Sequence, residues 1–346
     1  MRYPEFLKEN GTIGFVAPSF GCSFEPYISC FNRVLSIFEN MGYKSQLGPN
    51  CYLGDGIGIS TDPKSCGQEL TESYISDDND VIISCGGGEL MCETISYVDF
   101  DVIGNSTPKW YMGYSDNTNF TFLLTTLCDV ASLYAPCAGT FAMDPWHESI
   151  HTTWDVLTGK TLCVNSFEKY EILSLKDEEH PFSPYNLTET TCIKAYNFSM
   201  QTVEVENLEM KGRLVGGCMD CLCNLVGTRF DKVNEFVEKY KDDGIIWFLE
   251  ACDLNVFSIR RAMWEMKEAG WFKYTRGFIF GRPLNGGDMF NLDHYEAVLS
   301  TVRELSVPAI LDADIGHVSP MMPMICGAVG DIKFRDGKLT IDFELK

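Results

Sequence analysis

The chain of 346 residues is poor in basic side chains, in histidine and in long apolar runs. Its 27 Lys and Arg stand against 49 Asp and Glu, which gives a formal net charge of -22 at pH 7. Because such a field repels polyanions on average, we expect neither nucleic acid nor an anionic membrane as a partner. No run of about 18 apolar residues occurs, so the sequence predicts no membrane-spanning helix.

An export signal and a disulfide framework are also not expected. The first residues, MRYPEFLKENGTIGFVAPS, contain no apolar region followed by a small-residue cleavage site. The 15 cysteines are odd in number, and many stand within apolar stretches, among them Cys30, Cys85, Cys128, Cys252 and Cys326. Buried thiols in a reducing compartment explain this pattern best, so we expect a cytoplasmic protein.

The length and the hydrophobic pattern predict two domains, of which the first is a doubly wound α/β fold of the flavodoxin or Rossmann kind. In the first half, strand-like and helix-like segments alternate, which favours a parallel sheet covered on both faces. The strand-like segments are 12–19, 80–88, 109–115 and 131–136, and the helix-like segments are 25–42, 90–97 and 119–127.

The remainder of the chain is expected to form a connection and a second domain. Residues 165–205 are polar and lack a clean period, which fits a functional connection and a plain solvated linker equally well. The end of the chain predicts a hairpin or meander with turns at Gly330-Asp331 and Asp336-Gly337. We therefore divide the sequence into a first domain, a connecting segment and a second domain, with bounds 1–165, 166–208 and 209–346.

Ser115, in the segment GYSDNT, stands where a predicted strand turns sharply into a helix. This is the mechanical arrangement of a nucleophile elbow, at the carboxyl end of a parallel strand where α/β sheets bind ligands. The helix start also favours a developing oxyanion. Spacing alone leaves a helix cap equally open, because Ser, Asp, Asn and Thr are all good cap residues. The pattern G-x-S-x-G is not met, since Asn117 replaces the second glycine.

A second motif, CGGGE, follows another predicted buried strand, and its glycines let the backbone approach a ligand closely. It can serve as an oxyanion hole or a phosphate cradle, although a tight strand-to-helix turn is the commoner meaning. It is neither G-x-G-x-x-G nor a Walker motif.

A serine nucleophile needs a base, and only five histidines are available: His147, His151, His180, His294 and His317. The first three lie in polar segments, and His294 is expected on an exposed helix face. His317 lies in a loop after an apolar strand, where a catalytic base is commonly placed. We therefore choose His317, while noting that a lone loop histidine is more often structural.

Glu250 ends the apolar strand IIWFLE, where an unpaired carboxylate is costly to bury. The imidazole of His317 is one candidate partner, and a salt bridge to Arg260 or Arg261 is the alternative. A metal site is not expected: Cys218, Cys221 and Cys223 form C-x-x-C-x-C, but no second pair with zinc spacing follows, so core thiols explain them better.

Several segments together resemble the LD-carboxypeptidase family of serine peptidases, which includes microcin C immunity peptidases. They are VAPS, the GGG turn, GYSDNT, the LVGG segment that runs to Thr228, FLE and GH, in this order from about Thr12 to the end. The resemblance implies a Ser-Glu-His triad of Ser115, Glu250 and His317 across two domains. It further implies a smaller, β-rich, barrel-like second domain, no metal or organic cofactor, and a homodimer.

In this family's mechanism, the backbone N–H of Asp116 and that of Gly87 or Gly88 would form the oxyanion hole. The length and the extended connection are similar to the microcin immunity branch, which cleaves a peptidyl-nucleotide amide. The alternative is a murein LD-carboxypeptidase, although Cys85 replaces the arginine usual there. The connection has no tryptophan to stack on a nucleobase, for which Phe182 or Tyr185 could substitute, and Cys218 replaces the asparagine of the family's GGN. A non-catalytic nucleotide- or peptide-binding protein is the remaining reading.

Overall fold

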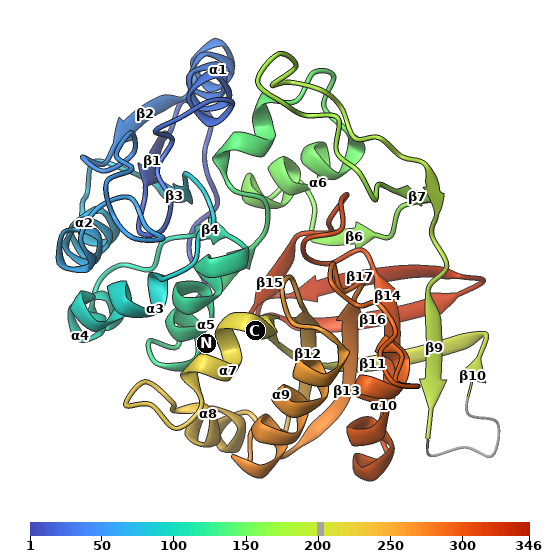
Figure 1. Ribbon diagram of the computed structural model, residues 1–346. Coiled ribbons are helices and arrows are strands. Elements are labelled where there is room, and N and C mark those ends of the chain that lie inside the picture. Colours follow the sequence, from blue (N-terminus) through green and yellow to red (C-terminus); the bar gives the residue numbers. More distant parts are fainter. Residues whose placement is uncertain (199–203) are drawn as a thin grey trace. The chain divides into compact units, whose positions relative to one another are not determined.

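The computed structural model describes residues 1–198 and 204–346, which form two compact units (Figure 1). The first unit comprises Met1–Thr161 and Leu173–Asn186, and the second comprises Leu162–Ile172 and Leu187–Lys346. The predicted connecting segment, 166–208, contributes to both units, and its residues 199–203 lie outside the described residues. Among the described residues, no helix is long and apolar enough to cross a membrane.

The first unit is built on parallel strands in the order β2-β1-β3-β4-β5. This is the flavodoxin-like order, in which the chain reverses its direction of winding between β1 and β3. The bounds of these strands are β1 (Thr12–Val16), β2 (Lys44–Leu47), β3 (Val81–Ser84), β4 (Tyr111–Gly113) and β5 (Ser132–Tyr134).

Helices cover both faces of this sheet. Successive side chains of a strand point to opposite faces, so neighbouring residues of one strand pack against different helices. Phe15 of β1 meets rings of α1 on one face, while Val16 packs on the other face into the core formed by α2 to α5. The predicted α/β class is confirmed. The helices are α1 (Tyr27–Asn40), α2 (Pro63–Ile75), α3 (Met91–Thr94), η1 (Ile95–Tyr97), α4 (Phe100–Asn105), η2 (Ser115–Asn117), α5 (Thr118–Thr126), η3 (Ala138–Ala142) and α6 (Glu148–Leu157).

The second unit is β-rich, as predicted, and its main sheet has the order β10-β9-β14-β13-β12-β11-β16-β17-β6 among the described residues. The central strands β11 to β14 are parallel, and antiparallel strands flank them on both sides. The strands are β6 (Cys163–Asn165), β7 (Lys169–Tyr170), β8 (Glu189–Thr190), β9 (Lys194–Asn197), β10 (Glu204–Val205), β11 (Asn207–Cys218), β12 (Ile245–Glu250), β13 (Thr275–Gly281), β14 (Pro308–Ala313), β15 (Met324–Cys326), β16 (Val329–Arg335) and β17 (Lys338–Glu344).

Four helices connect the parallel strands of this unit: α7 (Met219–Leu225), α8 (Val233–Lys239), α9 (Val256–Glu268) and α10 (His294–Leu305). Side-chain caps mark the starts of the two longer helices, since the Asn255 side chain accepts from two backbone N–H groups of α9 and Asp293 caps α10. In both units, the carboxyl ends of the parallel strands therefore lie along one edge of the sheet, where open α/β sheets commonly hold their functional residues.

The C-terminal hairpin was predicted correctly in part. Its turn lies at Asp336 and Gly337, which have φ values of 50° and 76°. The turn predicted at Gly330-Asp331 is wrong, because both residues lie within β16 and pair with β11 and β17. The alternation of apolar and polar residues continues through this pair, and a glycine inside a continuous strand is no turn signal by itself.

Candidate functional site

Ser115 lies just beyond β4, and its backbone is left-handed, with φ at 64°. Residues other than glycine rarely adopt this conformation, and it recurs at sites where a fold fixes a side chain for function. The backbone N–H of Ser115 donates to the hydroxyl of the buried Tyr134 at 3.3 Å. Helix η2 begins at Ser115 itself, and α5 follows directly. The sharp strand-to-helix turn expected from the sequence is therefore present.

The glycine run lies directly against this serine. A methyl group on Gly87 would lie 3.1 Å from the Cβ and 3.2 Å from the Oγ of Ser115. A methyl group on Gly88 would lie 2.0 Å from the hydroxyl oxygen of Ser19, and the carbonyl of Gly87 accepts from the Phe20 N–H at 2.8 Å. The turn after β3 is therefore packed closely against Ser115, and a side chain on Gly87 would require its neighbours to shift.

The side chain of Asn117 connects the turn of GYSDNT (the serine turn) to the turn of CGGGE (the glycine turn) through hydrogen bonds. No pattern in the sequence indicates this role. Its amide nitrogen donates to the carbonyl of Gly86 at 2.8 Å and to that of Tyr114 at 3.1 Å. Its amide oxygen accepts from the Tyr111 hydroxyl at 2.5 Å. Because a glycine could make none of these bonds, they explain why asparagine occupies the place of the second glycine in G-x-S-x-G.

The carboxylate of Asp116 is a buried anchor for the loops around Ser115. It accepts from the Ser19 hydroxyl at 2.5 Å, from the Met91 N–H at 2.9 Å and from the Asn119 amide at 2.9 Å. Burial raises the pKa of this carboxyl group, while the hydrogen bond from Ser19 opposes the shift. The Asp116 side chain therefore holds together the loops that surround Ser115.

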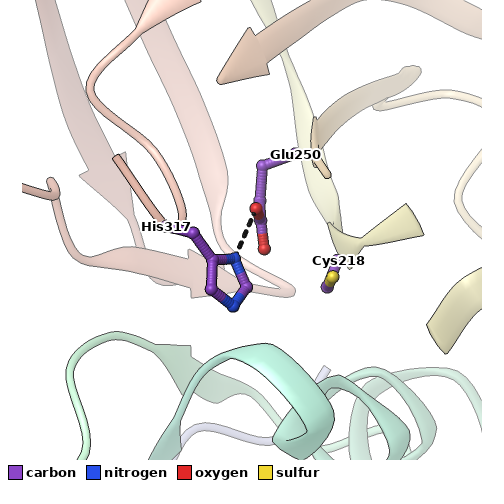
Figure 2. Close-up of side chains that lie close together, drawn as sticks. All are labelled: Cys218, Glu250 and His317. Carbon is purple, nitrogen blue, oxygen red and sulfur yellow. Dashed lines mark hydrogen bonds and ion pairs between the residues drawn. The ribbon is translucent and has the colours of Figure 1, made fainter. Parts of the chain in front are cut away.

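In the second unit, the structure brings Glu250 and His317 together (Figure 2). The Oε2 of Glu250 lies 2.8 Å from the Nδ1 of His317, and the two side chains are 0% and 12% exposed. Burial by itself lowers the pKa of His317, but the charge of Glu250 and hydrogen bonds to Cys252 and Glu250 outweigh it and raise that pKa. Glu250 ends β12, so a buried carboxylate holds an imidazole from a loop 67 residues away in sequence.

The backbone approaches the Glu250 side chain closely at two glycines, Gly316 and Gly281. Gly316 has φ at 93°, and a methyl group there would lie 2.4 Å from three atoms of the Glu250 side chain. A methyl group on Gly281 would lie 2.1 Å from the carbonyl oxygen of Ile315 and 3.0 Å from the Cβ of Glu250. Close backbone packing therefore fixes the orientation of the carboxylate before any ligand binds.

Cys218 is the third side chain of this group, and Figure 2 shows its thiol beside the Glu250 carboxylate. It ends β11 and is paired in register with Glu250 on β12. One donor atom each from Cys218, Glu250 and His317 lies within 4.8 Å of the others. The neighbouring Cys221 thiol, burial and the charge of Glu250 raise the pKa of the Cys218 thiol well above its usual value.

Asp220, on the first turn of α7, positions the loop that follows Glu250. Its carboxylate accepts from the backbone N–H groups of Cys252, Asp253 and Leu254 at 3.0, 2.8 and 3.1 Å. The Cys218 thiol also donates to it, at 3.3 Å. No pattern in the sequence indicates this role, because the contacts join residues that are 32 to 34 positions apart.

The other histidines have visible structural partners. The ring of His147 caps α6 by accepting from the Ser149 N–H, His151 stacks edge-on with Trp146, and His180 lies beside Asp177.

His294 was expected on an exposed helix face, but this is wrong. Its side chain is 26% exposed, and its Nε2 lies 3.1 Å from Oδ1 of Asp312. It is the first residue of α10, where the helix start faces the end of β14 rather than solvent.

The aromatic residues suggested for base stacking both have neighbours within the first unit. The guanidinium of Arg33 lies 4.5 Å from the ring centroid of Phe182. The ring of Tyr185 meets that of His147 at 5.4 Å with an edge-to-face geometry.

The alternative ion pair of Glu250 with Arg260 or Arg261 is not what the structure shows, since Glu250 pairs with His317. Ser115 and the Glu250–His317 pair belong to different units.

Two family models match the chain. The LD-carboxypeptidase N-terminal domain matches residues 13–135, and the LD-carboxypeptidase C-terminal domain matches residues 211–332. The chain belongs to the LD-carboxypeptidase family. It is therefore a serine hydrolase of the peptidase kind, and the resemblance seen in its motifs is confirmed.

Solved structures of microcin immunity proteins share the fold. The microcin C7 self-immunity protein MccF in its wild-type apo state matches with a TM-score of 0.81 and 20% identity, over 99% of each chain. An MccF-like protein from Bacillus anthracis matches with 0.79 and 21%, over 99% of this chain and 100% of its own. One from Streptococcus pneumoniae matches with 0.73 and 17%, over 96% and 99%. No curated protein sequence matches the chain significantly.

Proposed function

We propose that the protein cleaves an amide bond of a small peptide-like substrate by acyl transfer to Ser115, with His317 as base and Glu250 as the orienting acid. The observation that carries the proposal is the 2.8 Å contact between Glu250 and His317, buried at the end of β12. A buried carboxylate on Nδ1 fixes the ring tautomer and leaves Nε2 for proton transfer. The left-handed backbone of Ser115 supports its role as the nucleophile.

The proposed reaction has two steps. The Oγ of Ser115 attacks the scissile carbonyl carbon while Nε2 of His317 takes the hydroxyl proton. The amine then leaves with that proton, and water releases the acid from the acyl-enzyme by the same route. The Glu250 carboxylate stabilises the imidazolium that forms on His317.

We assign the oxyanion hole to the backbone N–H of Asp116 and that of Gly87 or Gly88. The closeness of Gly87 to the Ser115 hydroxyl supports this assignment, because an oxyanion formed at Ser115 would develop next to this backbone. The Asp116 N–H stands at the start of η2, directly after the nucleophile, which is the usual position of one such donor.

For the substrate, we propose a peptidyl-nucleotide amide of the microcin C kind. MccF structures have been solved with aspartyl sulfamoyl adenosine, with glutamyl sulfamoyl guanosine and with adenosine monophosphate, and this chain shares their fold over 99% of its length. The second candidate is a murein tetrapeptide cut between an L- and a D-residue, which the family description LD-carboxypeptidase favours.

The test is to incubate the protein with a peptidyl-nucleotide antibiotic and, separately, with a murein tetrapeptide, and to identify the products by mass spectrometry. Ser115→Ala should abolish turnover, whereas the matched control Ser36→Ala, on the exposed side of α1, should retain it. Full activity of Ser115→Ala would contradict the assignment of the nucleophile. Cleavage of only the murein peptide would contradict the assigned substrate.

We further propose that the protein works in the cytoplasm as a homodimer, with the nucleophile on the domain 1–165 and the acid and base on the domain 209–346. The buried thiols support the compartment and the family resemblance supports the dimer. Cell fractionation and light scattering of the purified chain test these two points.

A further inference from the structure

The side chains of Cys218, Glu250 and His317 form a compact set of sulfur, oxygen and nitrogen donors within the second unit. We propose that these three residues bind Zn²⁺, and that the bound ion inhibits the enzyme by occupying its base. The metal-binding half of this inference stands on the second unit alone. The inhibition half rests on the function proposed above.

The distances are close to those that a zinc ion requires. Zn²⁺ binds nitrogen and oxygen at about 2.0–2.2 Å and sulfur at about 2.3 Å with tetrahedral angles, so its ligand atoms lie roughly 3.3–3.6 Å apart. The donors here lie within 4.8 Å of one another, and the Glu250–His317 pair lies at 2.8 Å. Binding needs the carboxylate and the imidazole to separate by about half an ångström and the thiol to approach.

The three donors come from separate elements that the sheet holds in place. Cys218 and Glu250 are paired in register at the ends of the parallel strands β11 and β12, so their side chains emerge side by side. His317 comes from the loop after β14, and Gly316 of that loop lies so near Glu250 that an added methyl group would be 2.4 Å from its side chain. A site built on strand ends is largely ordered before the ion arrives, which lowers the entropic cost of binding.

The chemical types of the donors select the metal. A thiolate together with an imidazole and a carboxylate suits Zn²⁺ far better than Mg²⁺ or Ca²⁺, which take oxygen ligands. Three protein ligands leave one coordination position for water, as in catalytic zinc sites. Asp220 is not part of this set, because its carboxylate accepts three backbone N–H groups of the loop 252–254.

Binding is balanced by the release of protons. The thiol of Cys218 gives up its proton and its hydrogen bond to Asp220, and His317 binds as neutral imidazole, so the displaced protons pass to the buffer. The ion then separates Glu250 from His317 and occupies a ring nitrogen. An imidazole held in this way neither accepts the proton of Ser115 nor keeps its orienting contact, so turnover stops while the ion is bound.

Direct binding is measured first, with the full chain freed of metal by a chelator and then titrated with Zn²⁺ and Co²⁺. One equivalent of Zn²⁺ should bind, and Co²⁺ should give the visible bands of a tetrahedral site together with a thiolate-to-cobalt band in the near ultraviolet. The absence of a stoichiometric ion, or a cobalt spectrum without the thiolate band, would overturn the proposed site.

Variants assign the ligands. Cys218→Ser keeps the size of the side chain and should weaken Zn²⁺ binding by about a hundredfold or more, since even changes around a metal's direct ligands cost roughly ten- to hundredfold. Cys192→Ser, at an exposed thiol of the same unit, is the matched control and should bind as the unaltered chain does. Unchanged binding by Cys218→Ser, or an equal loss in Cys221→Ser, would contradict the assignment.

The inhibition is tested with the substrate that the cleavage assay identifies. Zn²⁺ should abolish turnover by the unaltered chain, and the chelator should restore it. Cys218→Ser should need about a hundredfold more Zn²⁺ for half inhibition of its own metal-free rate. If the ion binds through these residues but Ser115→Ala is fully active, the proposed function fails while the metal site stands. If Ser115 is essential but no ion binds, the reverse holds.

Discussion

The two units present their key residues at the same structural place but hold them by different forces. Ser115 and Glu250 both stand at the carboxyl end of a parallel strand. Ser115 is held by its own backbone, by the glycine turn and by the neutral amide of Asn117, and the Asp116 carboxylate anchors the loops around it rather than pairing with an opposite charge. Glu250 and His317 are held by a short contact between two side chains that are almost fully removed from water, where the carboxylate raises the pKa of the imidazole.

Because of this difference, we expect substitutions in the two halves of the proposed site to have different effects. The geometry of the serine turn depends on its backbone conformation. Substitutions there should therefore act through backbone strain and the loss of hydrogen bonds. The geometry of the acid–base pair depends on electrostatic interaction and close packing. Substitutions there should therefore also change the dependence of activity on pH.

The largest effect is expected at Ser115. Ser115→Ala and Ser115→Gly should both lower kcat/KM by roughly 10⁴-fold or more, because each removes the nucleophile. They should differ in stability: glycine adopts a φ of 64° freely, so the free energy of unfolding should be about 1 kcal/mol higher for Ser115→Gly than for Ser115→Ala. Thermal denaturation and turnover measure the two effects. Equal stability of the two variants would show that the left-handed backbone at residue 115 carries no strain.

Glu250→Gln should rank second, with a fall in kcat/KM of about 10²–10⁴-fold. The base must be neutral to accept a proton, and the Glu250 carboxylate raises the pKa of His317. For the unaltered chain, kcat/KM should therefore rise with pH through a value above the ordinary pKa of about 6.5. In Glu250→Gln this midpoint should move to lower pH. A midpoint that stays in place would show that the carboxylate does not act on the base.

Local patterns in the sequence were enough to predict strands β1, β3, β4, β5 and β12 and the serine turn, whereas the short strands β2, β6 to β10 and β15 were not predicted. The segment IIWFLE forms β12 with the same bounds, and the strand that carries Ser115 ends in the expected sharp turn. These features depend on neighbouring residues, so hydrophobic runs and turn residues indicate them directly. The glycine run also lies where the alternation of strands and helices placed it.

Contacts between distant residues were harder to predict. From the residues alone, the pairing of Glu250 with His317 was one of two alternatives, because the cost of burying a carboxylate calls for a partner without choosing it. The family resemblance implied His317. The roles of Asp220 and Asn117 were missed, because each depends on a loop that folding brings close. Cys218 was interpreted as a core thiol of C-x-x-C-x-C, whereas Glu250 and His317, the residues proposed to bind Zn²⁺ with it, come from other segments of the chain.

Gly316→Ala separates backbone strain from disturbance of the acid. The new methyl group would lie 2.4 Å from the Glu250 side chain at a φ of 93°, so the carboxylate must move. We expect a fall of about a hundredfold in kcat/KM, as for other misplacements of a catalytic group by about 1 Å. Gly337→Ala is the matched control, since its φ is 76° but nothing lies within 4 Å of the new atom. A similar loss of activity in both variants would mean that strain alone is responsible.

The smallest effect is expected at Asn117, and it tests whether the neutral half of the site depends on hydrogen bonds. Asn117→Ala removes the bond to the Gly86 carbonyl and leaves the buried Tyr111 hydroxyl without its acceptor. The free energy of unfolding of the first unit should fall by about 1–3 kcal/mol, because buried polar groups lose their partners.

Since the glycine turn then moves relative to Ser115, kcat should fall by about tenfold, which corresponds to about 1.4 kcal/mol, while the pH midpoint stays unchanged. Asn105→Ala is the control, because Asn105 bonds only within α4 through its amide and the Asp101 carbonyl, on an exposed surface. A shift of the pH midpoint in Asn117→Ala would contradict the separation into a neutral and a charged half, because Asn117 would then act on the base rather than on the nucleophile.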